Sequence, residues 1–479
     1  MGAAAVEFVV SSRSGMKLQP GTWTWDSPWN AVDMAVSISA NSPQQKVMGF
    51  GGAFTEASAI HFKSLSAAKQ EEVLELYFGR TGHQYTVGRV PINSCDFSPQ
   101  SYSFDDAADD FEMAQFDKEV THDRDNGMID FVRAASTKAQ SIGNNVVVYG
   151  SPWSPPSWMK TGNHAMVGSA MPCLKSDPRY HEAWAKYLSE WMTAYEKAGV
   201  EVWGLTVQNE PAFYSNNGWE ACSYTAAEER DFIKNHLGPQ LESDFGEGGK
   251  KIMMFDWNKD SLVDWADTIL SDAEAAKYVW GVGLHWYSGD FFDQVWYVSH
   301  NYDKPVLGTE GCNCDYDLPN YPDDWSRAAR YAHDIIGDMT NGVIGWTDWN
   351  LLLDVETQSG SGGPNHAGNN CFAQIHVVGG ELEITPSYYA YGHFSRYLTP
   401  GSVVFPYTAS GWGSSNVEGL SARRPDGSWV MILLNNGQSD LQVGIQTSSE
   451  AAAAGQVRVT LPAQSVGTVV FPEPTEAFV

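Results

Sequence analysis

The feature that most restricts the fold of this chain is an alternation of short apolar or β-branched segments with longer amphipathic ones between residues 45 and 389. Eight of the short segments have the composition of strands: Val47–Ala53, Tyr85–Asn93, Asn145–Ser151, Val202–Asn209, Lys251–Trp257, Trp280–Trp286, Pro305–Glu310 and Val343–Asn350. Several segments between them carry apolar residues at helical spacing: Ser66–Phe78, Asn126–Ile142, Arg179–Lys197, Ala226–Leu241, Ser261–Ile269 and Trp325–Met339. This alternation predicts an α/β fold in which a parallel sheet closes into a (β/α)8 barrel, the TIM barrel.

Both ends of the chain have a different pattern. Antiparallel strands are predicted near the start and after Pro400: Glu7–Val10, Met34–Ile38, Ser402–Tyr407, Gly419–Arg423, Ser428–Asn435, Leu441–Thr447 and Gln456–Leu461. We expect the two ends to meet in one smaller all-β sandwich, and two separate modules in line are the alternative. The predicted division is residues 1–44 for the first sandwich strands, 45–395 for the barrel and 396–479 for the rest of the sandwich.

Composition narrows the class of ligand. The net charge of −29 disfavours nucleic acid and anionic membranes as direct partners. The 19 tryptophans exceed what packing alone usually requires, and aromatic rings suit stacking on the C–H faces of sugars. A carbohydrate ligand is therefore the better expectation, although any single tryptophan is more often part of the core.

The cysteines and the apolar segments give information on the cellular location of the protein. The six cysteines show no metal-binding spacing. Neither a metal nor a cofactor is expected. One or two disulfides are possible, with a pairing that the sequence leaves open. No stretch approaches 18 uncharged apolar residues, so no transmembrane segment is expected. The first ten residues lack the pattern of a signal peptide. If the protein is secreted or extracellular, as we expect, this sequence begins near its mature end.

Two acidic residues stand where a barrel carries its chemistry, at the carboxyl ends of predicted strands. Glu210 follows the fourth strand in Val207–Pro211, and Glu310 ends the seventh. A lone glutamate at such a place is more often a surface ion pair. Two carboxylates at one opening are what glycoside cleavage requires, since one protonates the leaving oxygen and the other attacks the anomeric carbon or activates water.

Eight segments in order give the chain a recognisable likeness: VMGFGGAFTEA (47–57), GRVPINSCDFS (88–98), SPWSPPSWMKT (151–161), TVQNEP (206–211), AAKYVWGVGLHWY (275–287), GTEGC (308–312), GWTDWNLLLD (345–354) and GGPNHAGNN (362–370). Over nearly its whole length the chain resembles glycoside hydrolase family 30, and within it the glucosylceramidase (acid β-glucosidase) branch. The resemblance implies a retaining enzyme that cleaves β-glucosidic bonds by double displacement, with Glu210 as general acid/base and Glu310 as nucleophile.

The same resemblance implies the residues around the sugar. Those expected to bind substrate are Asp96, Trp153, Asn209, Trp286, Tyr287, Trp349 and Asn369. Asn209 is expected to contact the 2-hydroxyl and Tyr287 to lie beside the nucleophile, whereas Trp286 could equally fill the top of the barrel. Arg89, His285 and Asp348 are expected to give support, with a structural ion pair as the alternative for Arg89. 

The substrate expected from the resemblance is glucosylceramide or a similar β-glucoside, with transient contact to a lipid surface. An endo-β-1,6-glucanase is the alternative, a xylan-directed enzyme comes third, and a non-catalytic carbohydrate-binding protein is disfavoured because both glutamates are present. Two segments depart from the family pattern, Glu356–Gly363 and Asn216–Trp219. Both are expected to shape the binding of the leaving group, so the glucose subsite is better supported than the specificity beyond it.

Overall fold

The computed structural model describes residues 6–26, 31–162, 165–213, 218–355, 362–448 and 455–472. The chain forms two compact units. One consists of Gly51–Asp315 with Trp346–Glu383, and the other of Met1–Phe50, Tyr316–Gly345 and Ile384–Val479. The domain bounds expected from the sequence stay a prediction.

Eight parallel strands close into a barrel in the order β10-β11-β13-β5-β6-β7-β8-β9. Their bounds are β5 (Gly49–Ala53), β6 (Val87–Ile92), β7 (Val147–Pro152), β8 (Val202–Thr206), β9 (Lys251–Asn258), β10 (Val279–His285), β11 (Val306–Glu310) and β13 (Val343–Asn350). Each corresponds to one of the eight segments expected from the sequence, so the (β/α)8 prediction is confirmed. Parallel strands place their carboxyl ends at one edge, where the side chains of the site collect.

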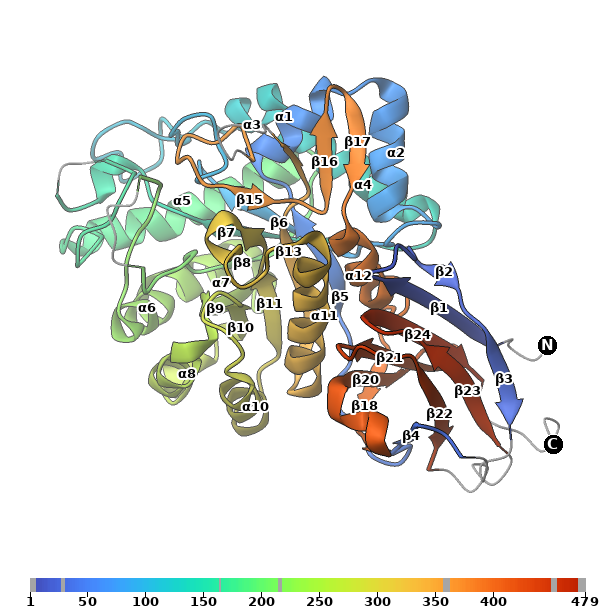
Figure 1. The fold of residues 1–479 in the computed structure, drawn as a ribbon. Helices are drawn as coiled ribbons and strands as arrows, with labels where there is room; N and C mark the ends of the chain where they lie inside the picture. The colour runs from blue at the N-terminus through green and yellow to red at the C-terminus, as the bar shows by residue number, and fades with distance from the viewer. Residues whose placement is uncertain are drawn as a thin grey trace. The chain divides into compact units, whose positions relative to one another are not determined.

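Helices follow the strands and lie outside the barrel (Figure 1). Those of this unit are α1 (Glu56–Ser64), α2 (Ala67–Phe78), α3 (Thr121–Asn126), α4 (Met128–Ser141), α5 (Pro178–Lys197), α6 (Ala226–Phe232), α7 (Gly238–Phe245), α8 (Leu262–Leu270), α9 (Ala273–Ala276) and α10 (Phe292–Asn301). Their starts follow local chemistry: the Ser66 hydroxyl accepts from the N–H of Lys69, and Thr225 forms a capping box with Glu228. The single helix expected over Ala226–Leu241 is interrupted by a π-helical turn, Ile233–Leu237.

The second unit contains a β-sandwich. One sheet has the order β18-β20-β21-β24-β1-β2 and the other β19-β4-β22-β23-β3. The first consists of β18 (Val403–Phe405), β20 (Val417–Arg423), β21 (Trp429–Asn435), β24 (Ser465–Phe471), β1 (Glu7–Ser12) and β2 (Gln19–Pro20), and the second of β19 (Tyr407–Ser410), β4 (Met34–Ile38), β22 (Leu441–Thr447), β23 (Gln456–Leu461) and β3 (Trp23–Asp26). This unit also holds α11 (Asp324–Thr340) and α12 (Pro386–Ser395).

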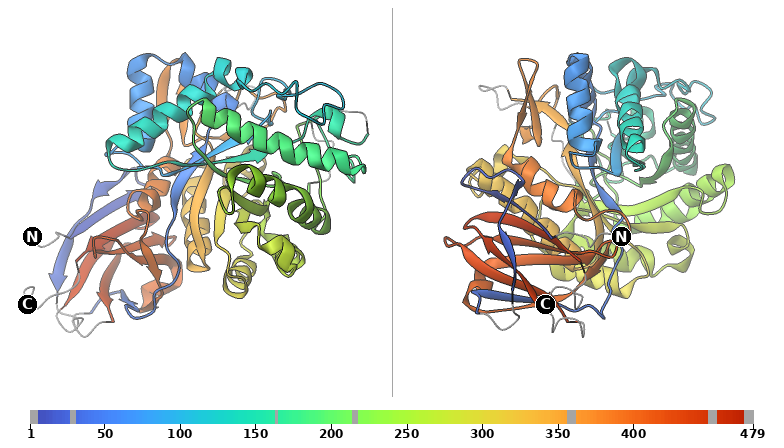
Figure 2. Two further views of the ribbon diagram at one scale, coloured as in Figure 1. Left: turned by 180° about the vertical axis from the view of Figure 1, so that it is seen from behind. Right: turned by 90° about the vertical axis from the view of Figure 1, so that its right-hand side faces the viewer.

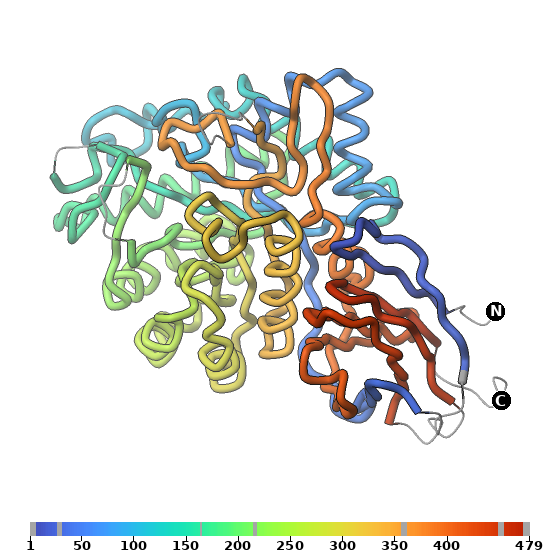
Figure 3. Tube along the Cα trace, viewed as in Figure 1, coloured from blue at the N-terminus to red at the C-terminus, as the bar shows by residue number. Residues whose placement is uncertain are grey.

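Both ends of the chain enter both sheets of this sandwich. Strand β1 pairs antiparallel with β24, and β4 pairs parallel with β22. Figures 2 and 3 show the first strands, in blue, among the last ones, in red. Their inward side chains form one core, which includes Val36, Trp429 and Val443. The prediction of one sandwich built from both ends is confirmed.

Two small sheets accompany the barrel. One consists of β14 (Leu352–Asp354), β16 (Ile375–Val378) and β17 (Glu381–Ile384), and in the other β12 (Asn313–Cys314) pairs with β15 (Cys371–Phe372). None of the helices in the described part of the chain has both the length and the apolar character needed to cross a membrane.

Candidate active site

Two glutamates from different strands come together at the carboxyl end of the barrel. Glu310 is the last residue of β11, and Glu210 lies just beyond the end of β8. One carboxylate oxygen of Glu210, one of Glu310 and one ring nitrogen of His285 all lie within 4.8 Å of one another. The glutamate side chains are 17% and 7% exposed, so the pair is enclosed yet reachable from solvent.

The backbone turns sharply at Glu210, which has a φ of +50°. Its N–H donates to the carbonyl of Asp256, and its own carbonyl accepts from the N–H of Phe213, both over 3.0 Å. A non-glycine residue in this left-handed region costs roughly 1–3 kcal/mol and persists only where its surroundings impose it. The hydrogen bond to β9 therefore fixes the turn that carries Glu210.

Arg89, in β6, is a fully buried cation at the centre of the site. Its guanidinium donates to Glu310 Oε2, to Asn209 Oδ1 over 2.8 Å, to Asp256 Oδ2 over 2.9 Å and to Ser151 Oγ over 2.9 Å. Burial alone would lower the pKa of Arg89, but the charges of Asp256 and Glu310 raise it. Arg89 thus makes buried ion pairs with Asp256 and with the nucleophile candidate Glu310. These contacts agree with both expectations for this residue, support of Glu310 and a structural ion pair.

Asp256, in β9, is a central residue that the sequence reasoning missed. Its fully buried carboxylate accepts four hydrogen bonds. The donors are Arg89 at 2.9 Å, Thr206 at 2.7 Å, Thr309 at 2.6 Å and His285 at 2.8 Å. Although burial would raise it, the charges of Arg89 and His285 hold the pKa of Asp256 below its usual range. The available signal was a lone acidic residue near the end of an otherwise apolar strand.

His285, at the end of β10, connects these carboxylates. Its Nε2 lies 2.8 Å from Asp256, and its Nδ1 lies 3.5 Å from Glu210 and 3.9 Å from Glu310. Burial would lower its pKa, but the charges of Glu310 and Asp256 raise the pKa of His285 to about 9. The imidazole is therefore cationic at neutral pH, and His285 with Arg89 balances the carboxylates of Asp256 and Glu310.

The two glutamates have different surroundings. Burial raises the pKa of Glu210, and the charge of Glu310 adds to this effect while His285 opposes it. Glu310 instead receives a donor on each oxygen, because Arg89 donates to Oε2 and the Tyr287 hydroxyl to Oε1 over 2.9 Å. One carboxyl is thereby favoured as the acid and the other as the carboxylate.

Asp96 and Asn369 meet beside this pair. Asp96 follows β6, and its Oδ2 accepts from Asn369 Nδ2 over 2.9 Å. Among the described residues, no group donates to its other oxygen, Oδ1, although that atom is buried. Burial, with the charge of Glu310, raises the pKa of Asp96 to about 7. An acceptor that is enclosed and has no donor is suited to a ligand hydroxyl.

Two of the expected aromatic residues form a stack. The rings of Trp153 and Trp349 lie 5.1 Å apart at 19°, and Arg89 lies over both. Trp286 is only 1% exposed, and its ring meets Trp346 edge-on at 5.3 Å. Trp286 thus packs the top of the barrel, and its contact with a sugar stays a prediction. Asp348 is also buried and accepts from Gln374 over 2.8 Å.

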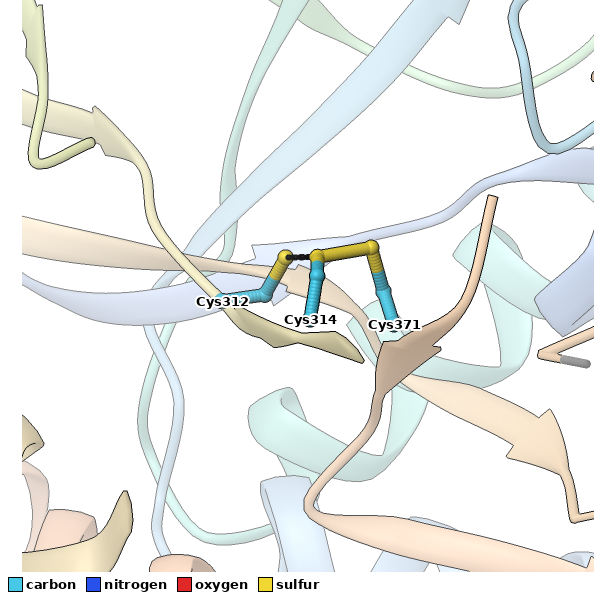
Figure 4. A group of neighbouring side chains, drawn as sticks. All are labelled: Cys312, Cys314 and Cys371. Carbon is cyan, nitrogen blue, oxygen red and sulfur yellow. Dashed lines mark hydrogen bonds between the residues drawn. A yellow bond between two sulfur atoms is a disulfide. The ribbon is translucent and has the colours of Figure 1, made fainter. Parts of the chain in front are cut away.

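A disulfide anchors the segment that carries Asn369. Cys314 of β12 is bonded to Cys371 of β15, and Cys312 Sγ lies 3.3 Å from Cys314 Sγ (Figure 4). The other disulfide joins Cys173 and Cys222. The structure thereby supplies the pairing that the sequence left open.

Within the part of the chain that the structure describes, two groups of side chains have the ligand types of a metal site, Glu210–His285–Glu310 and Cys312–Cys314–Cys371. Neither donor set fits a metal well. The first contains an imidazole that is cationic at neutral pH, and the second contains a disulfide in place of two thiolates. The expected absence of a metal and of a cofactor stays a prediction.

Two sequence expectations fall largely outside the described residues. Residues 214–217, which include Asn216 and Asn217, and residues 356–361 are not described. The shape that these segments give to the leaving-group side stays a prediction.

The chain matches two models of one family. Residues 47–398 match the glycosyl hydrolase family 30 TIM-barrel domain, and residues 401–469 match the beta-sandwich domain of the same family. The family resemblance drawn from the sequence is thereby confirmed.

Several known proteins are similar over most of their length. "Putative glucosylceramidase 3" of Caenorhabditis elegans is 38% identical over 92% of this chain and 83% of its own length, and the lysosomal acid glucosylceramidase of Mus musculus is 30% identical over 96% and 88%. An endo-1,6-beta-D-glucanase of Trichoderma harzianum is 26% identical over 95% and 88%. The crystal structure of SrfJ from Salmonella typhimurium superposes with a TM-score of 0.86 at 30% identity, covering 98% of this chain and 100% of that one.

Proposed function

The chain belongs to glycosyl hydrolase family 30 and is a glycosidase, and on that premise we propose that it is a retaining β-glucosidase whose leading substrate is glucosylceramide. The observation that carries the mechanism is the approach of Glu210 and Glu310, whose nearest oxygens lie within 4.8 Å. Retaining enzymes hold their two carboxyls about 5–5.5 Å apart, whereas inverting enzymes leave about 6.5–9.5 Å for a water between them. The shorter separation supports direct attack by a carboxylate.

Glu310 is the nucleophile in this proposal. Arg89 and Tyr287 donate to its two oxygens, so the carboxylate is charge-balanced and held in one orientation. It attacks the anomeric carbon of the glucosyl unit as the bond to the leaving oxygen breaks. The product of this step is a glucosyl ester of Glu310 with the anomeric configuration inverted once.

Glu210 is the acid and then the base. Burial and the charge of Glu310 raise its pKa, which favours the protonated carboxyl that must protonate the leaving oxygen. When Glu310 becomes an ester, its charge is lost and one cause of that raised pKa disappears. Glu210 can then accept a proton from the water that attacks the ester, and the second inversion restores the β configuration.

The glucose subsite is proposed around Asp96. Its partnerless Oδ1 would accept a sugar hydroxyl, and the amide of Asn369 already donates to its other oxygen. The Oδ1 of Asn209 is occupied by Arg89, which leaves the NH2 group of Asn209 to donate to the 2-hydroxyl. The Trp153–Trp349 stack would supply the apolar wall.

The leading substrate and its main alternative differ in the leaving group. The two glucosylceramidase relatives are more similar to this chain than the endo-1,6-glucanase is, which favours the lipid glycoside. The catalytic pair argues against a protein that only binds carbohydrate. Cleavage of glucosylceramide would also place the enzyme in sphingolipid metabolism and bring it into transient contact with a lipid surface.

Product analysis tests this proposal. The purified enzyme is incubated separately with glucosylceramide, β-1,6-glucan and xylan. Proton NMR then identifies the sugar product of each reaction and the anomer in which it is first released. We expect β-glucose from glucosylceramide and no release by the Glu210→Gln variant, because ceramide is a poor leaving group that needs protonation. Oligosaccharides from the glucan alone would assign the endo-glucanase activity, and α-glucose as first product would reject the retaining mechanism.

We also infer a secreted or extracellular location. Two disulfides support it, because such bonds persist in oxidising compartments. Fractionation of the source cells with a specific antibody tests this inference, and recovery of the enzyme only from a reducing compartment would reject it.

A further inference from the structure

A buried acidic residue outside the catalytic pair holds together three segments at the glucose subsite. Glu220 is fully buried, and its Oε1 accepts from Ser94 Oγ over 2.8 Å and from Ser101 Oγ over 2.6 Å. Its Oε2 lies 3.2 Å from Nε2 of His366. Ser94 and Ser101 lie on either side of Asp96 in the sequence, so the carboxylate of Glu220 is hydrogen-bonded to both ends of the segment that carries Asp96.

His366 lies on the segment that carries Asn369. Its backbone N–H and its ring Nδ1 both lie 2.9 Å from the carbonyl oxygen of Ser98. Three residues on, Asn369 is tied to Asn365 in both directions: its N–H donates to Asn365 Oδ1 over 3.0 Å, and its carbonyl accepts from Asn365 Nδ2 over 2.8 Å. A shift of His366 would therefore be transmitted to Asn369.

We propose that Glu220 and His366 are a positioning pair that fastens residues 362–370 to the Asp96 segment and so holds the amide of Asn369 against Asp96. The inference rests on the proposed function in one respect, the assignment of Asp96 and Asn369 to the glucose subsite. Neither residue of the pair touches Glu210 or Glu310 in the described contacts, so the pair acts on substrate binding and not on the chemical step.

The covalent anchor of this segment lies on the other side of Asn369. Cys371, two residues after it, is bonded to Cys314. On the N-terminal side of Asn369, the ion pair between His366 and Glu220 connects residues 362–368 to the segment that carries Asp96. Asn369 thus lies between a disulfide and an ion pair. Loss of the ion pair would leave the contacts of His366 with Ser98 in place, and Asn369 would be held less firmly on that side.

The energetics favour a charged pair. A buried carboxylate needs compensation, which two hydroxyls and an imidazolium supply to Glu220. Contact with Glu220 raises the pKa of His366 to about 9, and although burial opposes it, His366 helps lower the pKa of Glu220. Both groups are therefore charged through the neutral range.

The first test is a split between KM and kcat. In His366→Gln and Glu220→Gln, we expect KM for an aryl β-glucoside to rise about tenfold, the size of one lost polar contact, with kcat within about twofold of the wild type. His300→Gln is the matched control, because His300 is an exposed histidine of α10, and its KM should be unchanged. A fall in kcat with no change in KM would overturn the positioning role.

A double-mutant cycle identifies the residue through which the pair acts. If His366 works by holding Asn369, then His366→Gln should raise KM by less than about twofold in an Asn369→Ala background. Equal effects of His366→Gln in both backgrounds would reject the coupling.

Hydrogen exchange separates this inference from the proposed function. We expect peptides covering residues 362–372 to exchange faster in His366→Gln than in the wild type, with peptides of β6 and β11 unchanged. If the wild type cleaves no β-glucoside, the proposed function fails and the exchange result alone decides the pair. Unchanged exchange over residues 362–372 would overturn the inference whatever the activity.

Discussion

Five titratable side chains at the carboxyl end of the barrel form one charge-balanced group. Two of them, Arg89 and His285, are cationic, and Asp256 and Glu310 lie against them as carboxylates. Glu210, the fifth, lies 3.5 Å from His285, yet burial and the charge of Glu310 outweigh that cation and raise its pKa. The difference between acid and nucleophile thus arises from the neighbours and not from the residue type, which is glutamate in both cases.

Replacement of Glu310 by glutamine tests the nucleophile. An amide keeps the volume of the side chain but is a far weaker nucleophile than a carboxylate, so we expect kcat to fall by at least about a thousandfold. The thermal unfolding temperature should stay close to that of the wild type, because the polar contacts with Arg89 and Tyr287 can partly persist. Activity within tenfold of the wild type would contradict the assignment.

The pH profile tests the role of His285. Activity needs a protonated Glu210, so kcat/KM should fall as the pH rises through the pKa of Glu210, which lies above its ordinary value of 4.5. His285 lowers that pKa, so in His285→Gln the alkaline fall should move to higher pH. The measurement is kcat/KM between pH 4 and 9 on an aryl β-glucoside. An alkaline limb in the same place would contradict the coupling.

At the scale of the element, β9 shows how a strand departs from regular geometry to build a site. Phe255 and Asp256 both have positive φ, +77° and +58°, and the pairing with β10 shifts register nearby. The N–H of Phe255 donates to Oε1 of Glu229, a fully buried residue of α6, over 2.8 Å. The helix thus supports the distortion that orients Asp256.

Substitutions at Glu229 test that support. Burial raises the pKa of Glu229 to about 8, so its carboxyl is mostly protonated at pH 7 and Glu229→Gln should change the free energy of unfolding little. Glu229→Leu leaves the Phe255 N–H without an acceptor and should cost about 1–3 kcal/mol. Denaturant unfolding at pH 7 measures both variants. Equal destabilisation by glutamine and leucine would contradict the role of the acceptor.

The same residue gives a pH dependence of stability. The folded state keeps a proton on Glu229 up to about pH 8, whereas the unfolded chain loses it near the ordinary glutamate pKa of 4.5. Between these values the folded state binds more protons, so this contribution to stability is lost as the pH rises. The loss should be absent in Glu229→Gln, and a wild type and variant with parallel stability curves would contradict it.

At the scale of the whole molecule, strands distant in sequence become neighbours in both units. The barrel closes β13 onto β5, and in the sandwich β4 lies between β19 and β22. Strand β4 is therefore an interior strand that the first part of the chain contributes to a sheet built mainly from the last part. Its alternation of buried and half-buried residues, from Met34 to Ile38, matches this position.

Two neighbouring substitutions in β4 test its interior position. Val36 is 1% exposed within the sandwich core, whereas Ser37 faces the other side. Val36→Asp would bury a carboxylate without a partner and should cost at least about 3 kcal/mol of unfolding free energy, and Ser37→Asp less than about 1 kcal/mol. Denaturant unfolding measures the difference. Equal costs would contradict the orientation of the strand.

Periodicity and strand-end position were sufficient for much of this protein. The eight barrel strands, the sandwich from both ends and the placement of Glu210 and Glu310 at strand ends all follow from local pattern, because apolar repeats report which face of an element is buried. The course of a single helix was harder to predict: apolar spacing indicated one helix over Ala226–Leu241, but it did not indicate the π-helical turn at Ile233–Leu237.

Other properties depended on closure of the barrel. Asp256, the pairing of Cys314 with Cys371 and the contact of Glu220 with His366 join segments far apart in the sequence. The raised pKa of Glu210 likewise requires burial and the nearby charge of Glu310. The sequence by itself determined which elements form and which acids end their strands, because those signals are local. The tertiary structure decided which charges meet and in which protonation state, because electrostatic interaction depends on distance and on exclusion of water.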